Sequence, residues 1–254
     1  MEVNKIYCEN CIDTMSKMPD GFVDLTVTSP PYGTLRDYKG YSFPFKDIAK
    51  ELFRVTKDGG VVVWVVGDAT VKGSETGTSF RQALYFKEVG FNLHDTMIWN
   101  KGSFTNPSGN RFHQVFEYMF VFSKGKPKTY SEILERKNKY IGKRGASGRD
   151  KNGDRKIGFS EVKREYGNLF NVWDVSVGGG ISYKGKINHP AIFPEKIALN
   201  HIIAWSNEGD LVYDPFMGSG TTAKMSILNN RNYIGSEISK EYCEIAEGRV
   251  NENL

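Results

Sequence analysis

The sequence has few cysteines and histidines, and it has no long apolar run. Its 254 residues include 3 cysteines and 4 histidines. A membrane-spanning helix needs about 20 mostly apolar residues, so none is predicted, and the N-terminus lacks the apolar core of a signal peptide. These absences lead us to expect a soluble, cytoplasmic protein without membrane contact.

The cysteines and histidines do not form a recognisable metal site. Cys8 and Cys11 make one C-x-x-C pair, which alone could be half of a zinc site or a redox pair, and Cys243 stands by itself. A structural zinc ion needs four ligands, and the histidines lack ligand spacing. We therefore expect no metal and reduced, structural thiols.

Strand-like and helix-like segments alternate along most of the chain. With 39% hydrophobic residues, the sequence can bury one sizeable core. Apolar, β-branched runs alternating with segments of helical spacing predict an α/β fold with a mainly parallel, doubly wound sheet. The predicted strands are 23–28, 61–66, 95–99, 118–123, 211–214 and 233–236, and the predicted helices are 45–56, 80–89, 194–205, 221–228 and 240–250.

A glycine-rich segment, Asp214 to Thr222, follows the strand beginning at residue 211. Within it, Gly218, Gly220 and Ala223 fit the G-x-G-x-x-G/A fingerprint, in which bare backbone approaches a nucleotide at a strand-to-helix turn. Glu237 follows at nearly the spacing expected of an acidic residue that binds ribose. The pattern predicts an adenosine site.

A second motif, Thr28-Ser29-Pro30-Pro31-Tyr32, ends the strand 23–28. The motif suits the binding of an exocyclic amine of a nucleobase. The lone pair of such an amine is delocalised into the ring. Acceptors that hold the amine's hydrogens out of the ring plane redirect that lone pair. Ser29 and a rigid Pro30 carbonyl could accept, while Tyr32 could stack on the base. By itself, the motif could also be only a strand-ending turn.

The order of these motifs is unusual. Only 31 residues follow Ala223, which is too few to complete a nucleotide-binding sheet, so the other strands of the sheet must precede the glycine-rich segment. Over nearly the whole chain, this order resembles the circularly permuted beta class of DNA amino-methyltransferases. The resemblance implies a Rossmann-like sheet, S-adenosylmethionine as cofactor, base flipping in duplex DNA and a restriction-modification context. No Pro-Cys nucleophile of ring-carbon cytosine methyltransferases is present.

The resemblance also assigns site residues. It implies a catalytic motif and a cofactor site, in which Asn10 stands where an Asp is usual. The catalytic residues are Ser29, Pro30, Pro31 and Tyr32, and the cofactor-binding residues are Asn10, Asp214, Phe216, Gly218, Gly220, Thr221 and Glu237. An alternative for Asp214 is a turn-forming, helix-capping carboxylate. We call the glycine-rich segment 214–222 the cradle. The family motif that precedes the cradle matches residues 189–195.

Ser29 bears on the identity of the base. In the resembled family, S-P-P-Y usually accompanies methylation of the 4-amino group of cytosine, whereas D-P-P-Y or N-P-P-Y accompanies the 6-amino group of adenine. The sequence therefore favours a site-specific cytosine-N4 methyltransferase, with adenine-N6 methylation as the alternative.

Positive charge is concentrated in one segment. Residues 124–186 contain 16 Lys and Arg against 7 Asp and Glu, although the whole chain carries only +4. We expect a basic, loop-rich target-recognition insertion at 125–185, inside a catalytic domain formed by 1–124 and 186–254. Its candidate DNA-binding residues are Lys143, Arg144, Arg149 and Lys151. The alternative is a solvated surface insertion.

Other functions explain less of the sequence. A nicotinamide-dependent oxidoreductase would use the glycine fingerprint and Glu237, but not T-S-P-P-Y. A catalytically inactive DNA-binding protein would explain the basic segment but not the glycine-rich segment. RNA or a protein amide could also supply the amine. The sequence leaves open a companion restriction enzyme, a monomeric or homodimeric state, and a bacterial, archaeal or phage origin.

Overall fold

The computed structural model describes residues 1–31, 43–104, 109–177 and 193–252. It divides into two compact units. The larger consists of Met1–Ser131 and Asn171–Leu254, and the smaller is Glu132–Phe170. No helix among the described residues is long and apolar enough to cross a membrane.

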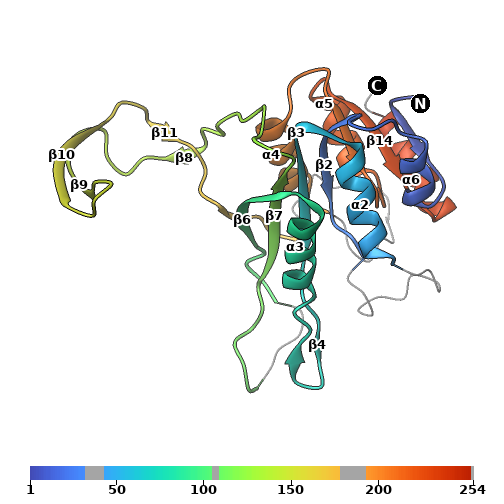
Figure 1. The fold of residues 1–254 in the computed structure, drawn as a ribbon, viewed down its shortest axis with the longest axis horizontal. Helices are drawn as coiled ribbons and strands as arrows, with labels where there is room; N and C mark the ends of the chain where they lie inside the picture. Colours follow the sequence, from blue (N-terminus) through green and yellow to red (C-terminus); the bar gives the residue numbers. More distant parts are fainter. Residues whose placement is uncertain (32–42, 105–108, 178–192, 253–254) are drawn as a thin grey trace. The chain divides into compact units, whose positions relative to one another are not determined.

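The larger unit is built on an eight-stranded sheet in the order β1-β14-β13-β2-β3-β7-β6-β12 (Figure 1). All neighbouring strands are parallel except where β7 pairs with β3 and β6. The strands are β1 (Lys5–Tyr7), β2 (Val23–Thr28), β3 (Thr56–Val66), β6 (Asn92–Asn100), β7 (Phe116–Ser123), β12 (Val172–Asp174), β13 (Leu211–Asp214) and β14 (Asn232–Ser236). The expected mainly parallel α/β sheet is therefore confirmed, with one reversed strand.

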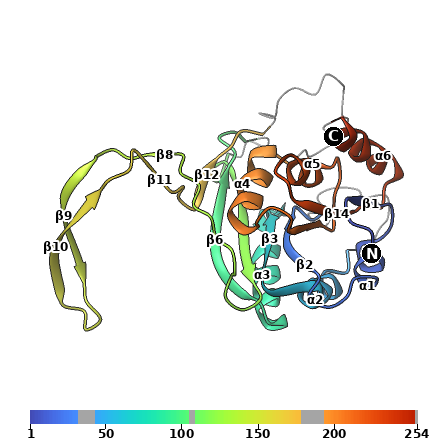
Figure 2. The same ribbon diagram turned by 90° about the horizontal axis from the view of Figure 1, so that it is seen from above.

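Helices cover both faces of this sheet. Those from the N-terminal half, α1 to α3, lie on one face, and α4 to α6 lie on the other (Figure 2). They are α1 (Cys11–Ser16), α2 (Phe45–Val55), α3 (Thr78–Val89), α4 (Glu195–Trp205), α5 (Thr221–Leu228) and α6 (Lys240–Asn251). A small hairpin, β4 (Thr70–Val71) with β5 (Ser74–Glu75), precedes α3.

The central strands are buried on both sides, as the apolar run at 61–66 predicts. Every residue from Val61 to Val66 is at most 1% exposed. On α2, the helically spaced Ile48, Leu52 and Val55 are also fully buried in this core. The sheet edge that carries the site therefore rests on a closely packed scaffold.

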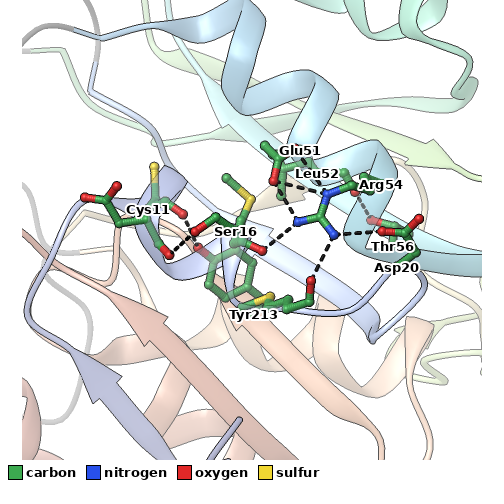
Figure 3. Close-up of polar contacts among 11 residues, drawn as sticks. Cys11, Ser16, Asp20, Glu51, Leu52, Arg54, Thr56 and Tyr213 are labelled. Carbon is green, nitrogen blue, oxygen red and sulfur yellow. Dashed lines mark hydrogen bonds and ion pairs between the residues drawn. The ribbon is translucent and has the colours of Figure 1, made fainter.

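The short helix α1 is missing from the sequence prediction, and an arginine joins it to α2. The guanidinium of Arg54 donates to the carbonyl oxygens of Met15 at 2.6 Å and Met18 at 2.9 Å, and it pairs with Glu51 at 2.7 Å (Figure 3). Met15 lies in the last turn of α1 and Met18 just beyond it, so Arg54 binds the backbone at the C-terminal end of this helix.

The smaller unit contains a long hairpin, so the expectation of loops is wrong for most of it. Strands β9 (Gly142–Arg149) and β10 (Arg155–Val162) pair antiparallel along their full length, and β8 (Arg136–Lys137) pairs with β11 (Tyr166–Gly167). No described side chain of residues 132–170 is buried. The unit thus has no core of its own, as its few apolar residues predict. We call β9 and β10 the basic ribbon.

The smaller unit is shorter than the predicted insertion at 125–185. Val172, Trp173 and Asp174 form β12, which extends the main sheet by pairing with β6, and Trp173 is 6% exposed. These residues fall inside the predicted insertion, but they belong to the larger unit. Residues 178–192 lie outside the described part of the chain.

Candidate active site

Four adjacent parallel strands end at the same edge of the sheet. In the order β1-β14-β13-β2, the candidate residues that end or follow these strands are Asn10, Glu237, Asp214 and Ser29. Ligands of open α/β sheets bind outside the carboxyl ends of the strands. The topology therefore gathers residues from both ends of the sequence into one row.

The two sequence motifs are joined directly by a buried hydrogen bond. Thr28 Oγ1, at the end of β2, donates to Asp214 Oδ1 at 2.6 Å. Asp214 also accepts from Thr222 Oγ1 at 2.7 Å and from the backbone N–H of Phe216 at 3.0 Å. Burial raises the pKa of Asp214 to about 6, although the three hydrogen bonds act in the opposite direction. The bond from Phe216 N shows that Asp214 shapes the turn, but no side chain caps α5, so Asp214 is not a helix cap.

The glycine-rich turn has the backbone that its fingerprint requires. Gly218 and Gly220 have φ angles of 53° and 83°, in the left-handed region that favours glycine. Gly220 is the N-cap of α5, which begins at Thr221. The partial positive charge of a helix N-terminus therefore lies at the turn, as in nucleotide cradles.

Glu237 lies one strand away and contacts the same turn. Its Oε2 accepts from Gly218 N at 2.9 Å, and its Oε1 accepts from Ser239 N at 2.8 Å. A carboxylate has about four acceptor positions, so these two bonds leave room for a diol. Burial raises the pKa of Glu237, while the backbone hydrogen bonds lower it.

Two more predicted cofactor residues have structural partners. Asn10 is the N-cap of α1, and its Oδ1 accepts from Ile12 N at 2.9 Å. An amide oxygen has a second lone pair, so the predicted contact with adenine stays open. Phe216 is half-buried and packs edge-on against Phe43, with ring centroids 5.7 Å apart.

The candidate catalytic motif begins where β2 ends. Ser29 is partly exposed and Pro30 is buried, followed by a partly exposed Pro31. Tyr32 lies outside the described residues, so its predicted stacking role stays a prediction.

The candidate DNA-binding residues lie on the basic ribbon or in its turn. Lys143 and Arg149 are exposed residues of β9, directly opposite Glu161 and Arg155, and Lys151 is exposed in the turn. Arg144 belongs to β9, but its side chain lies outside the described part of the structure. Among the described ion pairs of this unit, none involves Lys143, Arg149 or Lys151.

The sequence interpretation missed a buried arginine beside the cradle. Arg249 on α6 is 6% exposed, and its Nη1 donates to the carbonyl oxygen of Ser219 at 2.7 Å. Its Nη2 donates to Glu195 Oε1 at 3.0 Å, which also pairs with Lys224 at 2.8 Å. Arg249 looked like an ordinary basic residue in the last turn of a helix, and only its tertiary position distinguishes it.

The three cysteines are free, and burial raises the pKa of Cys11 to about 12. Within the described ranges, no group of three or more His, Cys, Asp and Glu residues could hold a metal ion.

Comparison with known proteins decides the family. A family model described as DNA methylase, covering enzymes of the N6 and N4 type, matches residues 23–248. The chain belongs to this N6/N4 DNA methylase family. It is also 62% identical over 237 residues to the orphan methyltransferase M.BamHII of Bacillus amyloliquefaciens, covering 91% of this chain and 89% of that protein.

More distant proteins share the architecture. The methylase is 28% identical to the Type II methyltransferase M.MthZI of Methanothermobacter thermautotrophicus, over 99% of this chain and 77% of the other. The structure of PvuII DNA methyltransferase, described as cytosine-N4-specific, superimposes with a TM-score of 0.73 and 22% identity, covering 96% of this chain and 85% of that one. A Thermus thermophilus protein described as a putative DNA modification methylase, complexed with S-adenosyl-L-methionine, superimposes with a TM-score of 0.65 and 22% identity, covering 98% of this chain and 95% of that one. At these identities the two structures support the fold.

Proposed function

We propose that this methylase transfers a methyl group from S-adenosylmethionine to the exocyclic 4-amino group of cytosine in duplex DNA. The observation that carries this proposal is the hydrogen bond from Thr28 to Asp214, which joins the amine-binding motif to the nucleotide cradle. Methyl transfer requires donor and acceptor side by side. The family membership and the Ser-Pro-Pro sequence after β2 support the same reaction.

The cradle residues fit the adenosine part of this cofactor. Gly218 and Gly220 give the turn its left-handed backbone at the N-terminus of α5, and Glu237 keeps acceptor capacity for two ribose hydroxyls. Asn10 would bind the adenine amine and Phe216 would contact the adenosine side, while Thr221 belongs to the turn. When bound, the cofactor supplies an electrophilic methyl group on a sulfonium.

Asp214 is proposed to act near the methionine amino group. Its three internal hydrogen bonds leave one of about four acceptor positions. An ammonium group nearby would favour the ionised carboxylate and thus lower the raised pKa of Asp214.

The Ser-Pro-Pro segment is proposed to prepare the amine for attack. Ser29 Oγ and the Pro30 carbonyl accept the two amine hydrogens and hold them out of the ring plane. The nitrogen lone pair is then directed toward the methyl group, and both contacts strengthen as positive charge develops on nitrogen. Pro31 stiffens the segment, and Tyr32 would stack on the base.

The amine of a paired cytosine is out of reach, so the base must leave the helix. Flipping costs a few kcal/mol, which contacts in the pocket offset. We propose that the smaller unit, within the inserted segment 125–185, binds the duplex. A two-stranded ribbon fits the major groove, and Lys143, Arg144, Arg149 and Lys151 would contact phosphates.

Direct analysis of modified DNA tests this function. The methylase is expressed in a host lacking DNA methylation, and its digested genomic DNA is examined by mass spectrometry. The expected product is N4-methylcytosine. N6-methyladenine alone would assign the enzyme to adenine and leave the amine chemistry intact, whereas 5-methylcytosine would contradict both the base assignment and the amine mechanism.

A further inference from the structure

Two residues of helix α6, one helical turn apart, contact the cradle. Arg249 binds the carbonyl of Ser219, as described above. A Cβ added at Gly220 would lie only 2.8 Å from the Cβ of Ala246 and 2.9 Å from its Cα. Because residues three apart share a helix face, Ala246 and Arg249 act on the same turn.

Arg249 fixes one particular peptide unit of the turn. In a trans peptide, the carbonyl and the N–H point in opposite directions. The carbonyl of Ser219 accepts from Arg249 at 2.7 Å, while the N–H of Gly220 donates to the carbonyl of Met217 at 2.9 Å. The peptide between Ser219 and Gly220 is therefore held from both sides, at the residue that caps α5.

The same guanidinium also binds side chains of the turn. Its Nη1 is 2.9 Å from Ser219 Oγ and 3.3 Å from Thr221 Oγ1. Arginine presents its donors in a rigid, planar fork, which a lysine cannot reproduce. The hydrogen bond from Nη2 to Glu195 reaches the first residue of α4. One side chain thus connects α6, the cradle and α4.

We infer that Arg249 is a positioning residue, which sets the backbone of the cradle for cofactor binding without touching the reacting atoms. This inference rests on the proposed use of S-adenosylmethionine. A left-handed glycine turn can reorient easily, so a turn that must present bare backbone to a ligand gains from an external support. Binding to a preorganised site avoids the cost of ordering the turn.

The chain offers a matched control for a general loss of stability. Arg231 likewise binds backbone: it is partly buried and donates to the carbonyls of Asn229 at 2.6 Å and Ser206 at 2.7 Å. It precedes β14 and thus lies at the amino edge of the sheet, opposite the cradle. Replacing either arginine with Met removes a guanidinium that donates to backbone carbonyl oxygen.

The experiment compares Arg249→Met, Arg249→Lys and Arg231→Met by thermal unfolding and by calorimetric titration with S-adenosylmethionine. Both Met variants should unfold at lower temperature than the wild type. Only Arg249→Met should bind the cofactor about 10- to 100-fold more weakly, the scale of a hydrogen bond to a charged group. Arg249→Lys should recover part of that loss. In kinetics, Arg249→Met should raise the KM for the cofactor more than the KM for DNA.

Each outcome bears on a distinct statement. If the wild type does not bind S-adenosylmethionine, the proposed function fails. If it binds and Arg249→Met binds equally well, Arg249 serves the fold alone and the inference is overturned. Equal losses of affinity in Arg249→Met and Arg231→Met would overturn it too. Should Arg249→Met not fold, Arg249→Lys keeps the charge, and wild-type affinity in that variant would refute a need for the fork.

Discussion

Thr28 and Asp214 lie 186 positions apart in sequence, and their side chains share a buried hydrogen bond of 2.6 Å. The bond crosses from the end of β2 to the end of β13, which are neighbouring parallel strands. Because one residue precedes Ser29 and the other opens the cradle, a displacement of either motif is transmitted to the other.

This bond yields a stability prediction with a defined pH dependence. Thr28→Val keeps the shape of the side chain but removes the donor, which should lower the free energy of unfolding by about 1 to 3 kcal/mol. The lost bond stabilises the ionised carboxylate of Asp214, whose folded pKa is about 6. The loss should therefore be larger at pH 8 than at pH 5. Urea unfolding at both pH values measures it, with Thr28→Ser as the control. An equal loss at both would mean that Asp214 does not ionise in this range.

Glu237 gives a prediction on cofactor affinity. Glu237→Ala should weaken binding of S-adenosylmethionine by about 1.5 to 3 kcal/mol, since it removes hydrogen bonds to a charged group. It also frees Gly218 N, which the carboxylate now holds at 2.9 Å. Calorimetry measures the change, and Glu244→Ala on the exposed side of α6 is the control. Unchanged affinity in Glu237→Ala would remove this residue from the site.

A buried histidine predicts sensitivity to acid. His201 on α4 is fully buried, neither ring nitrogen has a partner among the described residues, and burial lowers its pKa to about 3. In the unfolded chain its pKa is near 6.5. Below that value the unfolded state binds more protons, so stability falls as the pH drops from about 6.5 toward 3. His201 should contribute a loss of about 2 kcal/mol between pH 8 and pH 5.

The contribution of His201 is measured as a difference between variants. Asp214 has a folded pKa of about 6, above its ordinary 3.8, so it favours the folded state as the pH falls and opposes the histidine. The variant His201→Leu should lack the loss of stability in acid that His201 causes. It should keep the opposite contribution of Asp214, which stabilises the fold as the pH falls. His94→Leu, which changes an exposed histidine, is the control. Parallel pH profiles for the wild type and His201→Leu would contradict a depressed pKa in the fold.

The alignment of the candidate residues at one sheet edge was predictable, because local sequence patterns and parallel strand pairing together determine it. The apolar strands at 23–28 and 211–214 end directly before Ser29 and within the glycine-rich turn, and parallel strands bring their carboxyl ends together. Glu237 followed from the spacing of the fingerprint. These features depend on a few neighbouring residues and on one topological rule.

Other features could not be predicted from local sequence patterns, or were missed although the sequence carries a signal for them. Arg249 is buried by α4 and the cradle, which no local pattern reveals. The basic ribbon did leave a signal, because Asn152-Gly153 is a hairpin turn sequence, and Gly153 has a φ of 88°. Its strands contain many glycines and charges and few apolar residues, so composition indicated loops. Asn10 as the N-cap could similarly have predicted α1.

The basic ribbon predicts the salt dependence of DNA binding. Replacing Lys143, Arg144, Arg149 and Lys151 with Ala should weaken binding and reduce the slope of log K against log salt by about 0.9 for each phosphate that the variant no longer neutralises. The control removes four exposed positive charges from helices of the larger unit. These residues are Lys50, Arg81, Lys87 and Lys240. An unchanged slope in the ribbon variant would identify the ribbon residues as solvated surface, and equal changes in both variants would indicate only an effect of net charge.

Replacing Ser29 should affect turnover without affecting the binding of DNA or of the cofactor. If its hydroxyl holds an amine hydrogen most strongly when positive charge develops on nitrogen, Ser29→Ala loses a contact of the transition state rather than of the bound substrate. Single-turnover rates with bound DNA should then fall by about tenfold or more, while the affinities for DNA and for the cofactor stay near those of the wild type. Thr26→Ala, a buried change on the same strand at an oxygen without a described partner, should leave the rate largely intact. Ser29→Ala with a normal rate and weaker DNA binding would make Ser29 a substrate-binding residue, and the acceptor role would then rest on the Pro30 carbonyl alone.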